Sequence, residues 1–206
     1  MRRPLVYRYA VLLLGLLTLG LSGCASSTPS KFYTLTSMES TGPAGDTHSA
    51  THVSVVALGP LSIPDYLDKP QIVTRSGRNE LAVDEFHRWG GSLENDVLRV
   101  LFENLSALLP ADQYHVVNWI HPAQPFAPGD YRVSVDLVRF DGILGDSVSL
   151  KATWSVFRKD RDVTVRRSSI TEPIRGGDYK SLVEAMSRAM EGLSRDIAGT
   201  ITSFKD

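Results

Sequence analysis

The sequence predicts an α+β domain: an antiparallel or mixed β-sheet with two amphipathic helices packed on one face. Two kinds of periodicity lead to this fold class. Residues 131–140 and 149–157 alternate apolar and polar side chains, which is typical of half-buried strands. Residues 93–108 and 182–204 instead repeat apolar side chains every three or four positions, as amphipathic helices do. Because neither helix can bury its apolar stripe alone, we expect both to cover the same side of the sheet.

The amino-terminal segment has the pattern of a signal peptide. Arg2, Arg3 and Arg8 precede an apolar run from Ala10 to Leu21. As a helix this run would be about 18 Å long, which is shorter than the ~30 Å hydrocarbon core of a bilayer. We therefore expect residues 1–23 to direct export and then to be removed.

The apolar run ends in Leu21-Ser22-Gly23-Cys24, which resembles a bacterial lipobox. In such a sequence the chain is cleaved between Gly23 and Cys24, and the cysteine receives lipid, including palmitate. Cys24 is the only cysteine, so it cannot form an internal disulfide, and acylation accounts for its presence better than a chance cysteine after an ordinary signal peptide. Ala25 follows it where lipoproteins kept at the inner membrane usually have Asp, which favours the outer membrane, facing the periplasm.

The remaining chain is predicted to form one domain close to the membrane. Cleavage would leave 19 basic and 23 acidic residues, an acidic balance that argues against nucleic acid as a partner. Residues 24–30 form a short tether, and six or seven extended residues reach about 20–25 Å. The domain itself is expected to span residues 31–206.

The strands can be placed in chain order. The first is expected at 31–35, and an exposed loop follows at 36–51. Further strands are predicted at 52–58, 71–75 and 114–120, and an antiparallel meander is predicted at 131–140, 149–157 and 163–170. Turn residues separate the meander strands, and we interpret their carboxylates as solvated side chains: Asp141, Asp146, Asp160 and Asp162.

Each helix has a predicted beginning or end. Ser92 is available as the N-cap of the first helix and Pro110 ends it, whereas Asp178 can cap the second. Met186 and Met190 lie on the apolar stripe of the second helix and are interpreted as core residues. The three tryptophans are interpreted in the same way: Trp89, Trp119 and Trp154.

No pattern in the sequence indicates catalysis, a metal site or a cofactor. His48 and His52 have a helix-like spacing, but their Ser, Thr and Gly neighbours form helices poorly and no third ligand is placed. Nucleophile elbows and phosphate-binding loops are absent from the sequence. We therefore expect a protein that is not an enzyme.

Several segments of the sequence, taken together, resemble the PqiC/YmbA-like family, whose members are also described as ABC-type transport auxiliary lipoproteins. They run in order through nearly all of the mature chain: "FYTL", "VVALGPLSIPDYLDKPQIVTRSGRNEL", "RW", "YRVSVDLVRFDG" and "LKATWSVF". The most specific part is Pro64 to Val73, supported by Arg88-Trp89 and Arg139-Phe140-Asp141, whereas Gly90-Gly91-Ser92 departs from the family pattern.

The resemblance implies a non-enzymatic subunit that works with MCE-domain tunnel proteins and, through them, with inner-membrane components in lipid transport between membranes. It also suggests a ring of identical copies as one possible assembly. Two other function classes remain open at this point: a scaffold lipoprotein of another envelope machine, and a lipid-binding or hydrolytic domain.

The segment Ile63 to Arg75 has two interpretations. Its two prolines restrict φ and extend the residues before them, which makes a stiff corner. The corner is either purely structural or a partner contact, and the candidate contact residues are Pro64, Asp65, Tyr66, Leu67 and Asp68. Tyr66 and Leu67 would be the contact side chains in the second case, because aromatic and apolar anchors dominate interfaces.

Overall fold

The computed structural model describes residue 9 and residues 28–39, 53–118, 127–158 and 163–204. These residues form an α+β domain, as the sequence predicts. Its elements in chain order are β1 (Lys31–Tyr33), β2 (Ser54–Ser62), the 3₁₀ turn η1 (Asp65–Leu67), β3 (Gln71–Arg75), β4 (Leu81–Trp89), α2 (Leu93–Leu108), β5 (Tyr114–Asn118), β6 (Tyr131–Gly142), β7 (Ser147–Arg158), β8 (Thr164–Pro173) and α3 (Tyr179–Ser203).

The strands form two sheets. The larger sheet has the order β5-β2-β6-β7-β8. Strands β6, β7 and β8 are antiparallel neighbours, which confirms the predicted meander, while β2 runs parallel to both β5 and β6. The smaller sheet has the order β1-β4-β3, with β1 parallel and β3 antiparallel to β4. Strand β4 and the division into two sheets were not predicted from the sequence.

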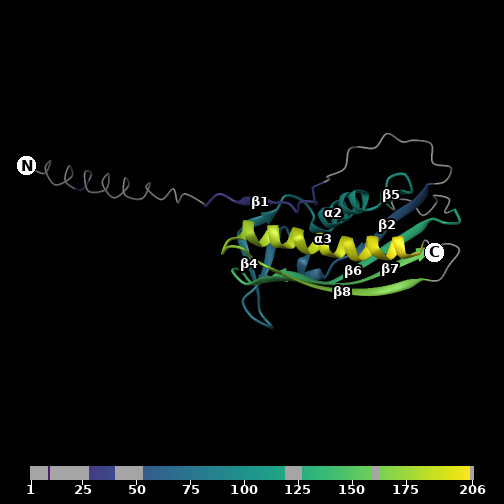
Figure 1. Ribbon diagram of the computed structural model, residues 1–206. Helices are drawn as coiled ribbons and strands as arrows, with labels where there is room; N and C mark the ends of the chain where they lie inside the picture. Colours follow the sequence, from purple (N-terminus) through teal and green to yellow (C-terminus); the bar gives the residue numbers. More distant parts are fainter. Residues whose placement is uncertain (1–8, 10–27, 40–52, 119–126, 159–162, 205–206) are drawn as a thin grey trace, which may run out of the picture.

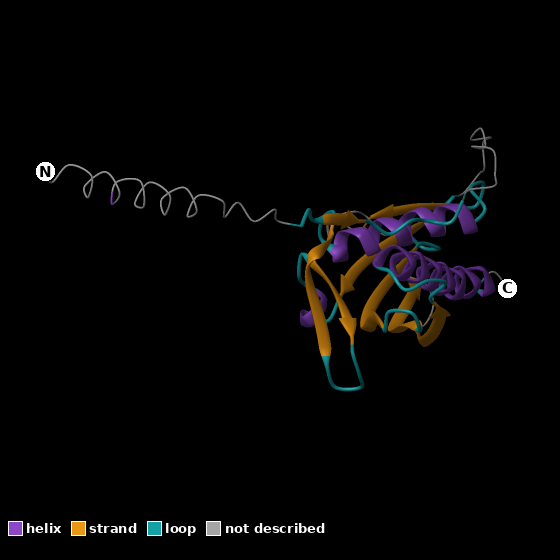
Figure 2. Cartoon of the chain, turned by 90° about the vertical axis from the view of Figure 1, so that its left-hand side faces the viewer, coloured by secondary structure: helices purple, strands orange, loops and turns teal. Residues whose placement is uncertain are grey.

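Both helices cover the same face of the five-stranded sheet (Figures 1 and 2). Helix α2 packs on β2 and β5, and α3 packs beside it on β7 and β8. The inward residues of the meander alternate with outward ones, so β7 buries Val148, Leu150, Ala152, Trp154 and Val156. Met186 and Met190 of α3 are buried in the same core, as expected from their helical spacing.

A β-bulge at Val138 reverses the alternation within β6. The register with β7 shifts between Leu137 and Arg139, and Val138 itself is 56% exposed. After the bulge Phe140 points into the core beside Leu150, so Arg139 and Asp141 point to the opposite face. The late irregularity in the sequence pattern of this strand is therefore the bulge itself.

The two helices begin differently. Asp178 caps α3 as predicted, because its carboxylate accepts a hydrogen bond of 2.8 Å from the backbone N–H of Ser181. Ser92 occupies the N-cap position of α2, as predicted, but its side chain makes no capping hydrogen bond. The helix ends at Leu108, and Leu109 adopts the extended conformation expected of a residue before proline.

Residues 34–38 are held against both helices by side-chain hydrogen bonds. The carboxylate of Asp96 in α2 accepts from the N–H of Leu35 at 2.6 Å. Further along, the N–H of Met38 donates to the buried Asn104 of α2 at 2.8 Å, and the amide of Asn104 donates to Ser194 of α3 at 3.1 Å. The first residues of the predicted exposed loop thus belong to the folded body, while residues 40–51 lie outside the described part of the chain.

Candidate functional site

The segment after β2 is a tight corner built by proline and a single 3₁₀ turn. Pro64 is extended at ψ 141°, and its carbonyl accepts a hydrogen bond of 2.9 Å from the N–H of Leu67. The carbonyl of Pro70 then accepts a 2.8 Å hydrogen bond from the N–H of Trp89 in β4. The two prolines lack N–H groups and fix φ, so the chain turns here and enters β3 without leaving a backbone donor unpaired at either position.

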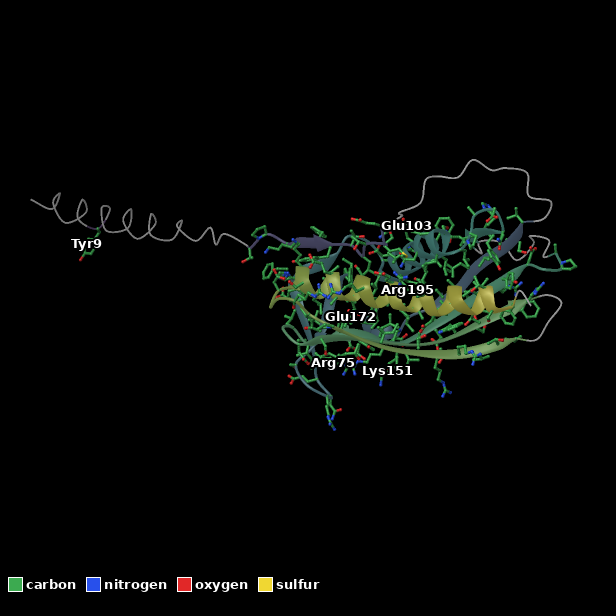
Figure 3. All side chains as sticks on the ribbon, viewed as in Figure 1. Tyr9, Arg75, Glu103, Lys151, Glu172 and Arg195 are labelled. Atoms are coloured by element: carbon green, nitrogen blue, oxygen red, sulfur yellow. The ribbon has the colours of Figure 1, made fainter. Side chains whose placement is uncertain are left out.

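A buried carboxylate lies beneath this corner. Asp141 is fully buried, and three donors from three different elements bind its two oxygens. The hydroxyl of Tyr66 in η1 donates at 2.6 Å to Oδ2, while Nε of Arg75 in β3 and Nε of Arg139 in β6 each donate at 2.8 Å to Oδ1. We call these four residues the Asp141 cluster; Figure 3 labels Arg75 on the side of the large sheet away from the helices.

The Asp141 cluster corrects one prediction. The expectation of a solvated carboxylate in a hairpin turn is wrong for Asp141, because residue 141 lies within β6 and pairs with Ser149 of β7. Its side chain faces away from the helices, where η1 and β3 cover it. Asp146, in the turn itself, is exposed as predicted. Asp160 and Asp162 lie outside the described residues.

The environment keeps Asp141 ionised. Burial alone raises the pKa of its carboxyl, but hydrogen bonds from Arg75, Tyr66 and Arg139 outweigh burial and hold the pKa below its ordinary value. Burial also raises the pKa of Tyr66, and its hydrogen bond to Asp141 raises it further. The guanidinium of Arg75 lies 5.8 Å from the centre of the Tyr66 ring as well, in a cation–π contact.

This arrangement suits cross-linking of elements better than proton transfer. A general acid or base needs a pKa near the working pH, whereas the pKa of the Asp141 carboxyl lies below its ordinary value and therefore further from neutral pH. Its oxygens already accept from three protein donors. The Asp141 cluster therefore joins η1, β3 and β6, and so joins the small sheet to the large one.

The candidate contact residues have different degrees of burial. Leu67 is 3% exposed and belongs to the core, while Pro64 and Tyr66 are half-buried. Asp65 and Asp68 are exposed, so they are the members of this set that a partner could reach most directly. Gly23 and Cys24, the predicted cleavage and lipidation residues, lie outside the described residues.

Sequence reasoning singled out Tyr66 and the Arg139-Phe140-Asp141 segment separately but did not connect them. It missed the role of Arg75 completely. The available signal was the spacing of Arg139 and Asp141, since residues two apart on a strand share one face. Arg139 and Asp141 on one face of a strand indicate an ion pair. Only the folded chain shows which other strand covers that pair.

A family comparison covers most of this fold. A family model described as "ABC-type transport auxiliary lipoprotein component" matches residues 33–198, from the end of β1 into the last turns of α3. The chain belongs to this family. The description is that of a transport component rather than of an enzyme.

Solved structures show the same fold as this auxiliary lipoprotein. A protein whose structure is described as that of an uncharacterized protein is 18% identical, with a TM-score of 0.69 over 84% of this chain and 99% of its own. A Xanthomonas campestris protein of the DUF330 family is 16% identical, with a TM-score of 0.65 over 85% of this chain and 97% of its own. No curated protein matches the chain.

The described residues of the auxiliary lipoprotein contain neither a membrane-spanning helix nor a cluster of metal ligands. No helix among them has both the length and the apolar run needed to cross a membrane. Within the same ranges, no three histidine, cysteine or acidic side chains are placed to hold a metal ion. His48 and His52, the pair whose spacing was considered above, lie outside those ranges.

Proposed function

We propose that this auxiliary lipoprotein is acylated at Cys24, sits on the periplasmic side of the outer membrane, and serves an MCE-type lipid transport system. In this role it receives the end of the transport tunnel and holds it beside the membrane. Residues 1–23 are the signal peptide, 24–30 the tether and 31–206 the docking domain. The observation that carries the proposal is the family match over residues 33–198 immediately after a lipobox-like sequence.

The structure of the amino-terminal region supports an anchoring role. Lys31 begins β1, only seven residues after Cys24, and β1 pairs with β4 in the body. The following residues are bound to α2 through Asp96 and Asn104. A lipid on Cys24 would therefore hold a folded body close to the membrane, within the roughly 25 Å that seven extended residues span.

The first experiment tests acylation and location. The chain with the intact leader is expressed in a bacterial host that is fed a clickable palmitate analogue, and Cys24→Ala is the comparison. We expect the label and outer-membrane fractionation for the parent chain and loss of both for the variant. An unlabelled parent chain in the periplasmic fluid would refute the anchor.

The second experiment tests the partner. The acylated chain is purified in detergent and the accompanying proteins are identified by mass spectrometry, and an MCE-domain protein is expected as the main partner. Asp65→Ala/Asp68→Ala removes two exposed carboxylates of the corner, whereas Asp112→Ala/Glu80→Ala removes the same charge elsewhere on the surface. If the MCE protein is lost from the Asp65→Ala/Asp68→Ala variant and kept by the control variant, the result supports contact at the corner. Recovery of another envelope complex without an MCE protein would favour the scaffold alternative.

A further inference from the structure

Four segments meet at the end of the domain where the tether enters. Strand β1, the last residues of β4, the β6–β7 turn and the first turn of α3 surround an open hollow of about 830 Å³. Figure 1 shows β1 and the beginning of α3 side by side at this end, with the carboxyl terminus at the opposite end. The side chains that matter for the argument are Phe32, Tyr33, His87, Leu144, Tyr179 and Lys180.

Three of these rings pack on one another and form a firm base for the hollow. His87 stacks on Tyr179 with ring centres 4.0 Å apart, and the hydroxyl of Tyr33 lies 3.2 Å from Nδ1 of His87. The ring of Tyr33 is tilted against that of Tyr179 at 6.5 Å. Tyrosine combines an apolar ring with a polar tip, and it is enriched at membrane–water interfaces.

Apolar side chains extend from this base into solvent. Phe32 is 67% exposed, and Ile143, which precedes Leu144 in the β6–β7 turn, is 38% exposed. Lys31 and Lys180 are exposed beside them, and so is Asp178, which also lines the hollow. A single exposed apolar residue is ordinary on a protein surface, so exposure alone does not identify a partner.

The position of the tether is what identifies the partner. Six residues separate Cys24 from Lys31, so a lipid on Cys24 places Lys31 within about 25 Å of the leaflet even when the tether is fully extended, and Phe32 is the next residue. Val165 is similarly exposed, at 62%, but it lies eight residues before Pro173 on β8, roughly 26 Å further from this end. The two side chains are thus alike in exposure and differ in their distance from the anchor.

We propose that this end of the domain rests on the phospholipid leaflet, with Phe32 entering the boundary between headgroups and acyl chains. Tyr33 and Tyr179 lie at the level of the headgroups, and Lys31 and Lys180 face headgroup phosphates. The proposal rests on the acylation of Cys24 proposed above. It adds an orientation: the long axis of the strands in the large sheet leads away from the membrane, and the opposite end of the domain faces the periplasm.

The test is photo-crosslinking in the full acylated chain. Phe32→p-benzoylphenylalanine is compared with Val165→p-benzoylphenylalanine, both in bacterial envelopes and in vesicles of phosphatidylethanolamine and phosphatidylglycerol. Phospholipid adducts are quantified by mass spectrometry of the irradiated chain. We expect position 32 to give several-fold more adducts than position 165. The same substitution at Ile143 gives a second position at the proposed contact.

The outcomes separate this proposal from the one on which it rests. If Cys24 carries acyl chains but positions 32 and 143 give no more phospholipid adduct than position 165, the domain does not rest on the leaflet by this end. Adducts to a protein at position 32 in place of lipid would overturn the proposal too and would assign this end to a partner. A chain without acyl groups at Cys24 contradicts the proposed function directly, whatever the adducts are.

Discussion

Arg75 in β3 donates a 2.8 Å hydrogen bond from Nε to Oδ1 of Asp141 in β6, and this contact joins the three-stranded sheet to the five-stranded one. Tyr66 and Arg139 bind the same carboxylate, so the corner at residues 64–70 is fixed on the body through a single buried charge.

Asp141→Asn is expected to lower the free energy of unfolding by about 3–5 kcal/mol, because it leaves two guanidinium groups facing a buried neutral amide. Urea unfolding followed by circular dichroism measures the loss. Asp146→Asn, on an exposed side chain at the end of the same hairpin, is the control and should change stability by less than about 0.5 kcal/mol. An equal loss in both variants would contradict the role of Asp141.

The contribution of Asp141 should also depend on pH. Its pKa is lower in the folded chain than the ordinary aspartate value of about 3.9, so the carboxylate stabilises the fold fully above that value. As the pH falls below about 4, the unfolded chain takes up the proton first and the stabilisation declines until the pH passes the folded pKa. The stability difference between the parent chain and Asp141→Asn should therefore stay constant from pH 7 to pH 5 and shrink below pH 4. A difference that grows on acidification would be inconsistent with the lowered pKa.

Tyr66→Phe separates the structural role of the corner from a contact role. It removes only the hydroxyl that binds Asp141, and hydrogen bonds to charged groups contribute about 1.5–3 kcal/mol. We expect a stability loss of that size in chemical denaturation, with unchanged recovery of the partner from detergent extracts. Reduced partner recovery at native stability would instead show that the hydroxyl faces the partner.

Asn104→Ala is expected to loosen the segment after β1. Asn104 is fully buried and accepts from the N–H of Met38, so its removal leaves that donor unpaired at a cost of about 1–3 kcal/mol. Hydrogen–deuterium exchange should show faster exchange at Met38. Ser106→Ala, on the exposed face of the same helix, should leave this amide unchanged.

Two glycines of α3 should respond differently to substitution by alanine. A Cβ at Gly199 would meet nothing within 4 Å, so Gly199→Ala gains helix propensity of up to about 1 kcal/mol and should raise Tm by roughly 2–4 °C. A Cβ at Gly192 would lie 3.0 Å from Cδ1 of Ile170, which offsets that gain. Differential scanning calorimetry of both variants compares them. Equal increases in Tm for the two variants would show that the Ile170 side chain moves aside without a measurable loss of stability.

The sequence was sufficient for elements whose partners lie next to them in the chain. Strands β6, β7 and β8 are consecutive and antiparallel, so simple alternation placed them correctly. The capping of α3 by Asp178 was equally local. Both helices were placed by their apolar stripes, and their common face followed because one sheet face must cover both stripes.

Features that depend on distant partners were not predictable in this way. Strand β4 was missed because both of its faces are largely exposed over Leu81 to Phe86, so it lacks a clear apolar alternation. The parallel pairing of β2 with β6 joins residues far apart in the chain. The burial of Asp141 requires the bulge at Val138 together with donors from η1 and β3, and no local pattern contains all of these.

The hydrogen bonds that hold residues 34–38 have a mechanical consequence. Any pull on the amino terminus first meets the short pairing of β1 with β4 and then the contacts to Asp96 and Asn104 on α2. From Asn104 the tension passes to α3 through Ser194, so two helices share it. A force applied at the amino-terminal end would therefore be distributed over β4 and both helices and would not act on β1 alone.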